Sequence, residues 1–376
     1  MAGIYIHIPF CKQACFYCDF HFSTNMALKD EMANSICEEI KLQKDYLENE
    51  KITSIYFGGG TPSLLSEKQL CKIMDTLYRY FTISKQSEIT IEANPDDITP
   101  KKLADLYLAG INRLSVGVQS FDEKVLKWMN RAHDATHAHQ CLKWINDSSF
   151  KNYSVDLIYG IPISTHAKWA EDLKNLTKYH PPHISSYCLT IEPNTVFGKW
   201  QKKGDLSEAS EDYAAEQFME LTNYLSAIGY QHYEVSNFCL PTFESKHNSS
   251  YWQQKPYLGL GPGAHSYNGF SRQFNIANNA LFIRSIKEGK LPFEKEILSR
   301  NDQINEYLMT SLRTSEGCDL DYLQHKYNYN FQEENSSTIN EWRKQGLCEV
   351  NQQKIILTPE GKLLADKLAA DLFLVD

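Results

Sequence analysis

The chain has 376 residues, of which 42% are hydrophobic, and a formal net charge of -9 at pH 7. This length accommodates two or three domains with a substantial core. The acidic balance argues against broad binding to nucleic acid or anionic lipid, so we expect no nucleic-acid partner. No apolar run approaches the roughly 20 residues of a membrane-spanning helix, and Met1-Ala2-Gly3 lacks a basic leader. We therefore expect a cytoplasmic protein whose thiols stay reduced.

Over the first 190 residues, short β-rich segments alternate with longer segments of helical period. The predicted strands are residues 4–8, 54–57, 88–92, 113–118, 154–158 and 184–189. The predicted helices are residues 27–47, 67–80, 100–109, 122–130, 134–146 and 166–179. Alternating units of this kind predict a parallel sheet, either doubly wound or curled into a barrel, and periodicity alone does not choose between the two.

The pattern changes after residue 200. A helix is predicted over 207–227, followed by an aromatic and glycine-rich segment over 230–274. The last part of the chain predicts helices at 303–313 and 336–345, a hairpin around 351–352 and a final helix at 359–369. These elements resemble a winged helix. Because the acidic charge of the chain disfavours DNA binding, we interpret this module as a lid or support. We expect three domains: 1–200, 201–295 and 296–376.

Three cysteines follow the first predicted strand with the spacing Cys-x3-Cys-x2-Cys: Cys11, Cys15 and Cys18. An iron-sulfur cube normally takes four cysteine ligands. Three close thiolates leave one iron open to a small molecule, as enzymes that use S-adenosylmethionine (SAM) require. This spacing is typical of the radical SAM signature, so it predicts a 4Fe-4S cluster and bound SAM.

Three other uses of these cysteines compete with the cluster. His21 or His7 could complete a Cys3His zinc site of the structural type. Burial in the core is less consistent with the polar neighbours of the three cysteines. A disulfide framework is disfavoured by ten cysteines spread over a long chain. Colour separates the two metal interpretations, because an iron-sulfur protein is brown and a zinc protein is colourless.

Polar and glycine-rich residues also follow the later strands. The run Gly58-Gly59-Gly60-Thr61-Pro62 comes after the second strand, Glu92 after the third and Gln119 after the fourth, and Asp156 lies in the fifth. The glycines allow a sharp bend or the close approach of a ligand. Because chemistry gathers at the carboxyl ends of parallel strands, these residues predict one shared pocket.

Four segments resemble the oxygen-independent coproporphyrinogen III oxidase group of radical SAM proteins: residues 5–11, 58–62, 115–121 and 156–162. The resemblance covers nearly the whole chain. It implies an α/β fold, a partial (β/α)6 TIM-like barrel with the cluster on the three cysteines, and a small C-terminal helical, winged-helix-like domain. It also implies SAM contacts at Tyr5, Tyr17, Gly59, Gly60, Thr61, Glu92, Gln119, Arg131 and Asp156.

Two departures from the oxidases matter. The oxidases carry a further cysteine where this chain has Phe20, and they have a long N-terminal extension ahead of the cluster motif. In this chain the first cluster cysteine is already residue 11, and both departures match the HemW-type heme chaperones, which also carry the motif His-Asn-x-x-Tyr-Trp, here residues 247–252. This resemblance implies a protein that delivers heme to apo-hemoproteins such as respiratory cytochromes, without coproporphyrinogen oxidase activity. The oxidase itself stays open as the alternative.

His247 is the predicted heme ligand, because imidazole is the commonest axial ligand. Tyr251 and Trp252 offer rings that can stack on a porphyrin. His265, in the glycine-rich segment close behind, is a second candidate. The sequence leaves open which histidine binds, whether SAM is cleaved, which hemoprotein receives the heme, whether the exchange takes place at the membrane surface, and whether the protein is a dimer.

Overall fold

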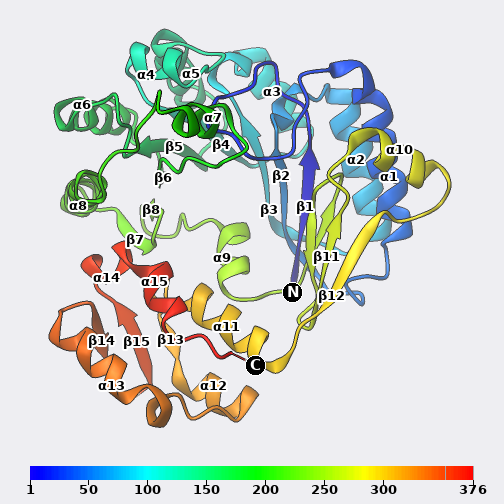
Figure 1. Ribbon diagram of the computed structural model, residues 1–376. Coiled ribbons are helices and arrows are strands. Elements are labelled where there is room, and N and C mark those ends of the chain that lie inside the picture. The colour runs from blue at the N-terminus through cyan, green and yellow to red at the C-terminus, as the bar shows by residue number, and fades with distance from the viewer. Residues whose placement is uncertain (352, 376) are drawn as a thin grey trace.

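The computed structural model describes residues 1–351 and 353–375. Six parallel strands lie side by side in chain order, and helices pack on their outer face (Figure 1). The strands are β1 Ala2–Ile8, β2 Ile52–Gly59, β3 Ile83–Ala93, β4 Arg113–Gln119, β5 Tyr153–Tyr159 and β6 His183–Cys188. The helices between them are α1 Lys29–Leu42, α2 Glu67–Tyr80, α3 Pro100–Leu108, α4 Glu123–Trp128, α5 Ala135–Asn146 and α6 His166–Thr177. The predicted alternation is confirmed, although α1 ends five residues before the expected position.

Further strands extend this sheet at both edges, and the sequence did not predict them. Strand β9 (Tyr257–Leu260) pairs parallel with β1. The antiparallel strands β10 His265–Tyr267, β11 Ser271–Asn275 and β12 Phe293–Ile297 continue from it. At the other edge β6 pairs with β8 (Asn237–Cys239), which pairs with β7 (Gln231–Glu234). The result is a twelve-stranded sheet whose parallel centre is a partial barrel.

Four helices accompany these additions: α7 Val196–Lys203, α8 Glu211–Ala227, α9 Lys246–Trp252 and α10 Asn279–Lys287. A buried carboxylate, Glu39 of α1, joins the added strands to the barrel. It accepts hydrogen bonds from the Gly261 amide at 2.7 Å and from Asn275 Nδ2 at 2.6 Å. Burial raises the pKa of Glu39 to about 7, although both hydrogen bonds oppose the rise.

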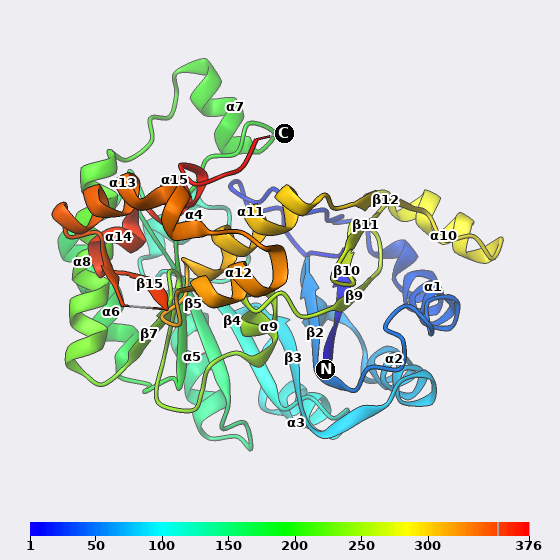
Figure 2. The same cartoon turned by 90° about the horizontal axis from the view of Figure 1, so that it is seen from below.

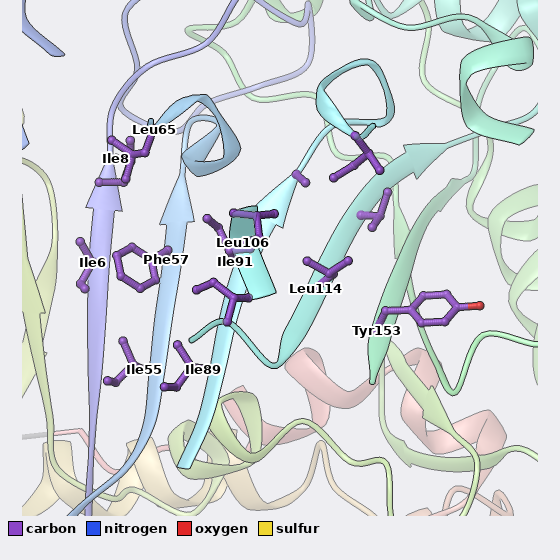
Figure 3. Packing of buried hydrophobic residues seen from close by; sticks show 14 of the residues in the cluster. Ile6, Ile8, Ile55, Phe57, Leu65, Ile89, Ile91, Leu106, Leu114 and Tyr153 are labelled. Atoms are coloured by element: carbon purple, nitrogen blue, oxygen red, sulfur yellow. The ribbon is translucent and has the colours of Figure 1, made fainter. Parts of the chain in front are cut away.

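The parallel strands have two chemically different faces. Apolar side chains such as Ile55, Phe57 and Leu114 point outward and pack against the helices (Figure 3). The alternate residues face the barrel interior and are mostly polar; β4, for instance, presents Arg113, Ser115, Gly117 and Gln119 to the interior cavity. Since successive side chains of a strand point to opposite faces, period-two alternation here marks a polar interior behind an apolar outer layer.

The C-terminal residues form a small module with its own hydrophobic cluster. Its helices are α11 Arg300–Ser311, α12 Leu320–Tyr327, α13 Phe331–Lys344, α14 Pro359–Leu363 and α15 Ala365–Ala370. Its three strands are β13 Cys318–Asp319, β14 Cys348–Val350 and β15 Lys354–Leu357, in the order β13-β15-β14. The hairpin β14–β15 agrees with the winged-helix-like prediction, although Gln352 lies outside the described residues. The expected final helix is divided at Leu364, and α12 was not predicted.

The module packs beside the barrel next to α9 (Figure 2). Arg313 carries much of this contact: its Nε lies 3.0 Å from Glu234 Oε1, and its guanidinium lies over the Trp252 ring at 5.3 Å. Among the residues that the structure describes, no helix combines the length and apolarity needed to cross a membrane.

Candidate functional site

A cavity of about 630 Å³ lies at the carboxyl ends of the parallel strands and extends into the barrel. This volume is within the usual range for cofactor and small-molecule sites. Of the residues predicted to bind the cluster, SAM or heme, all but two line this cavity. Those lining it are Cys11, Cys15, Tyr17, Cys18, Gly59, Gly60, Thr61, Glu92, Gln119, Arg131 and Asp156. Tyr5 and His247 are close by but outside the lining residues.

The cysteine loop after β1 is held by backbone hydrogen bonds, including Cys11 N to the Ser23 carbonyl and Phe16 N to the Met129 carbonyl, both 3.0 Å. The three thiols are free and half-buried. Burial raises the pKa of Cys11 to about 11 and that of Cys18 to about 12, and the charges of the neighbouring thiols add to both shifts. The three thiols are therefore close enough to interact through space.

The histidines near this loop are bonded elsewhere. His7 Nε2 lies 2.8 Å from the His21 carbonyl, and its Nδ1 lies 3.1 Å from the Tyr5 hydroxyl. Because a carbonyl only accepts, Nε2 carries the proton and Nδ1 accepts from Tyr5. His21 Nε2 lies 2.8 Å from Asn279 Oδ1. Both ring nitrogens of His7 are therefore engaged and unavailable to a Cys3His zinc site in this arrangement, whereas His21 is engaged through Nε2 alone.

The glycine loop after β2 is required by the close approach of the cysteine loop. A Cβ on Gly59, which has φ +106°, would lie 2.5 Å from the His7 ring. A Cβ on Gly60 would lie 2.7 Å from the Phe10 carbonyl oxygen and 2.8 Å from its amide nitrogen. The absence of side chains here is thus explained by contacts within the protein, whereas the sequence left a sharp bend and ligand approach as alternatives.

Two half-buried carboxyl groups border the cavity. Glu92 accepts hydrogen bonds from the Tyr56 hydroxyl at 2.9 Å and the Gly59 amide at 3.1 Å. Asp156 accepts from the hydroxyls of Ser115 and Ser154, each at 3.2 Å. Burial raises the pKa of Glu92 to about 7 and that of Asp156 to about 6, against the effect of these hydrogen bonds. Both groups can therefore gain or lose a proton near neutral pH.

Arg131 connects the cysteine loop to the strand ends. Its Nη1 donates to Cys15 Sγ at 3.3 Å and to the Tyr17 hydroxyl at 3.1 Å. Its Nη2 donates to Asn94 Oδ1 and to the Gly117 carbonyl, both at 2.7 Å. A single guanidinium therefore fixes the loop over the cavity. Gln119 beside it has a φ of +67°, an uncommon conformation for this residue type that is frequent at functional sites.

His247 lies on α9, and its side chain is buried beside the cavity. Its Nδ1 is 2.9 Å from Ser54 Oγ, its Nε2 is 2.8 Å from the Tyr251 hydroxyl, and its ring stacks on Tyr56 at 4.9 Å. Burial lowers the pKa of His247 to about 3, so the ring is neutral. The next residue, Asn248, is the one from this motif that lines the cavity. His265 is exposed on β10 and lies apart from the cavity lining.

Several cavity residues were missed from the sequence. The missed lining residues that carry polar or thiol groups include Tyr56, Asn94, Arg113, Ser115, Ser185, Cys188 and Asn248. Arg113 and Ser115 occupy alternate positions of β4, and this alternation is the signal that could have found them; Cys188 at the end of β6 does not alternate with Ser185. Asn248 has no such alternation, because it lies on a short helix; its signal in the sequence is the motif at residues 247–252, which singled out His247 and not Asn248.

The donor set fits a 4Fe-4S cluster, since three free thiols on one loop border the cavity and arginine holds the middle thiol. Within the described part of the chain, no three histidine, cysteine or acidic side chains already converge as a metal site.

The fold and the cavity together define a radical SAM protein: residues 5–176 match the Radical SAM superfamily, and residues 298–364 match the HemN C-terminal domain. The structure is similar to coproporphyrinogen III oxidase from Escherichia coli, with a TM-score of 0.85 and 24% identity over 99% of this chain and 90% of that one. This likeness confirms the predicted fold class.

Sequence relatives narrow the family. The chain is 33% identical to the heme chaperone HemW of Lactococcus lactis, over 99% of this chain and 97% of that protein. It is 33% identical to the Bacillus subtilis HemW, with 98% of each chain covered, and 35% identical to the Escherichia coli HemW, over 84% of this chain and 83% of that protein. The chain therefore belongs to the HemW family of the radical SAM superfamily.

Proposed function

We propose that this protein is a heme chaperone that holds a 4Fe-4S cluster and SAM in its barrel, binds heme and delivers it to apo-hemoproteins. The observation that carries the proposal is the identity of about one third to proteins named heme chaperone HemW along almost the whole chain. The cavity supports it, because its cysteine loop and strand-end polar groups suit the two cofactors of the radical SAM superfamily.

In this proposal Cys11, Cys15 and Cys18 ligate three irons. When bound, the cluster supplies one-electron chemistry and an open iron site for SAM. Glu92 and Asp156 would accept hydrogen bonds from ribose hydroxyls. Both can do so when ionised, and the pKa of each lies close to neutral pH.

The remaining SAM contacts would come from the cavity wall and mouth. Gln119 and Arg131 would contact the methionine end, near the cysteine loop that Arg131 already holds. Tyr17, Gly60 and Thr61 would form the mouth. Gly59 lines the cavity and donates its amide to Glu92, whereas Tyr5 lies outside the lining and contacts His7.

His247 remains the proposed heme ligand, and its surroundings set a condition for binding. Both ring nitrogens have hydroxyl partners, so Nε2 must leave Tyr251, or Nδ1 must leave Ser54, before either can bind iron. His265 needs no such exchange of partners at its exposed position. Heme would thus bind at α9 only with a local rearrangement of that helix or its side chains.

The cellular setting is proposed from the thiols. All ten cysteines are free, which suits the cytoplasm. We place the exchange of heme with an apo-hemoprotein there. Contact with an acceptor at the membrane surface and dimer formation are further parts of the proposal, for which solution mass and vesicle co-sedimentation are the direct measurements.

The test is anaerobic reconstitution with iron and sulfide, followed by two parallel assays. Heme-loaded protein is mixed with apomyoglobin as acceptor, and transfer is followed by the acceptor's absorption spectrum. The same protein, with SAM and a reductant, is given coproporphyrinogen III. We expect heme transfer and no protoporphyrinogen IX above a control without protein. Sustained product formation over many turnovers would establish the oxidase instead, a candidate favoured only by the shared fold.

Phe20 offers a variant for the same comparison. It is 70% exposed and lines the cavity mouth, at the position where the oxidases have a further cysteine. Phe20→Cys should fold normally, because little packing is lost at an exposed position. If this variant alone restores coproporphyrinogen conversion, Phe20 accounts for the absence of oxidase activity; if it does not, other parts of the site are missing.

A further inference from the structure

Arg113 at the beginning of β4 is a cation inside the barrel. Its side chain is 1% exposed, yet it belongs to the cavity lining. Among the described residues, its Nε and Nη2 have no hydrogen-bond partner. The hydroxyl of Thr90, the residue that pairs with Arg113 in the sheet register, is also buried without a partner. Unsatisfied buried groups of this kind call for an explanation, because each carries a desolvation cost.

The nearest carboxylate is only a partial counter-charge. Glu88 Oε2 lies 3.8 Å from Arg113 Nε, which is beyond hydrogen-bond distance. Glu88 instead accepts from the amides of His247 at 3.0 Å and Lys246 at 3.1 Å, at the start of α9. The same carboxylate therefore joins Arg113 to the helix that carries the heme motif.

The other groups around Arg113 compensate only part of its charge, because Asp156, whose pKa the charge of Arg113 lowers, makes its hydrogen bonds elsewhere. Burial lowers the pKa of His183 well below its usual value, and the positive charge of Arg113 lowers it further, as it does for His247, so both rings are neutral. Asp156 is held by serine hydroxyls nearer the mouth. A guanidinium is a planar fork that suits a carboxylate, and it gains most where water is excluded.

We propose that Arg113 binds a carboxylate group of the ligand in the inner part of the cavity. Strand rise places Arg113 about 20 Å along β4 from Gln119 at the mouth, from about 3.3 Å per residue. The methionine end of SAM would lie at the mouth beside the cysteine loop, so a propionate of heme is the favoured source. The choice of heme as the source of the carboxylate rests on the proposed function, whereas the binding of a carboxylate by Arg113 does not.

The experiment compares each ligand with an analogue that lacks the charge. Hemin is paired with hemin dimethyl ester, and SAM with decarboxylated SAM, using the reconstituted full chain. Each pair is titrated against wild type, Arg113→Gln and Arg113→Lys. Arg79→Gln, at an exposed arginine of α2, is the matched control. Thermal unfolding of each variant reports whether the buried substitution alters the fold.

In wild type, the ester should bind at least 10-fold more weakly than hemin, as expected for a charge-assisted hydrogen bond. Arg113→Gln should reduce this ratio to near one, Arg113→Lys should retain part of it, and Arg79→Gln should leave it unchanged. If substitution of Arg113 changes the affinity ratio of SAM to decarboxylated SAM instead, the bound carboxylate is that of SAM, and Arg113 is still the residue that binds it.

If neither ratio depends on residue 113, Arg113 holds only buried water or structure, and the proposal is overturned. Should Arg113→Gln fail to fold, the ratios of Arg113→Lys decide the question, since lysine keeps the charge but loses the fork. Failure of the proposed function would give a different result. Wild type would then bind neither hemin nor its ester, and the affinity ratio of the SAM pair would still test whether Arg113 binds a carboxylate.

Discussion

Gly59→Ala tests how the glycine loop supports the cysteine loop. The new methyl group would lie 2.5 Å from Cε1 and 2.6 Å from Nδ1 of His7, whose Nε2 holds the His21 carbonyl. Gly110 provides a matched control: its φ of +92° is close to the +106° of Gly59, but no atom lies within 4 Å of the position that a methyl group would take there. Both substitutions carry the same kind of backbone strain, and only one meets a neighbour.

The expected losses of unfolding free energy follow from this difference between the two sites. An alanine at positive φ costs about 1–2 kcal/mol, which applies to both variants. Overpacking against the His7 ring adds about 1–3 kcal/mol for Gly59→Ala alone. Before the unfolded-chain effect, which offsets both losses similarly, the sums are about 2–5 kcal/mol for Gly59→Ala and about 1–2 kcal/mol for Gly110→Ala, so we expect Gly59→Ala to lose about 1–3 kcal/mol more unfolding free energy.

Urea unfolding of the purified chain measures these losses, and iron content after anaerobic reconstitution measures the effect on the cluster. Displacement of His7 should loosen the loop that carries Cys11, Cys15 and Cys18, so Gly59→Ala should retain less iron than Gly110→Ala. Equal stability losses and equal iron content in the two variants would refute the reasoning, since the glycine would then serve only the backbone turn.

Three other outcomes are expected. Cys15→Ala should abolish cluster assembly, measured as iron and sulfide content, whereas Cys71→Ala on α2 should not; a full cluster in Cys15→Ala would refute the ligand assignment. Tyr251→Phe, which frees His247 Nε2, should strengthen heme binding about 2- to 10-fold, the equivalent of one hydrogen bond, and His247→Ala should change the heme spectrum; a spectral change only in His265→Ala would identify the other histidine. The pKa of Glu39 is raised to about 7 from 4.5, so its contribution to stability is present below about pH 4.5 and is lost as the pH rises toward 7. Glu39→Gln should accordingly gain roughly 2–3 kcal/mol relative to wild type between pH 5 and pH 8 in urea unfolding, and a constant difference would contradict this.

Local chemistry in the sequence was enough to predict the central alternation of parallel strands and helices, whereas the barrel was implied only by the family resemblance. The six parallel strands and the helices between them carry strong periodic patterns and caps, such as Ser66 before α2, and these signals lie within each segment. The cysteine spacing and the polar residues at successive strand ends predicted a single pocket. The structure brings them together there because parallel strands end at one edge of the sheet.

Only the tertiary structure decided the rest. Strand β9 pairs with β1 across some 250 residues, and such a pairing leaves no local pattern in a segment of four residues. The burial of His247 and the exposure of Asn248 to the cavity depend on how a seven-residue helix sits on Glu88. Alternation along β4 marks two faces but does not say which one meets helices and which one lines a cavity. That choice is made when the sheet curls, because its outer face is then covered by the apolar faces of the helices and its inner face keeps Arg113 and its polar neighbours.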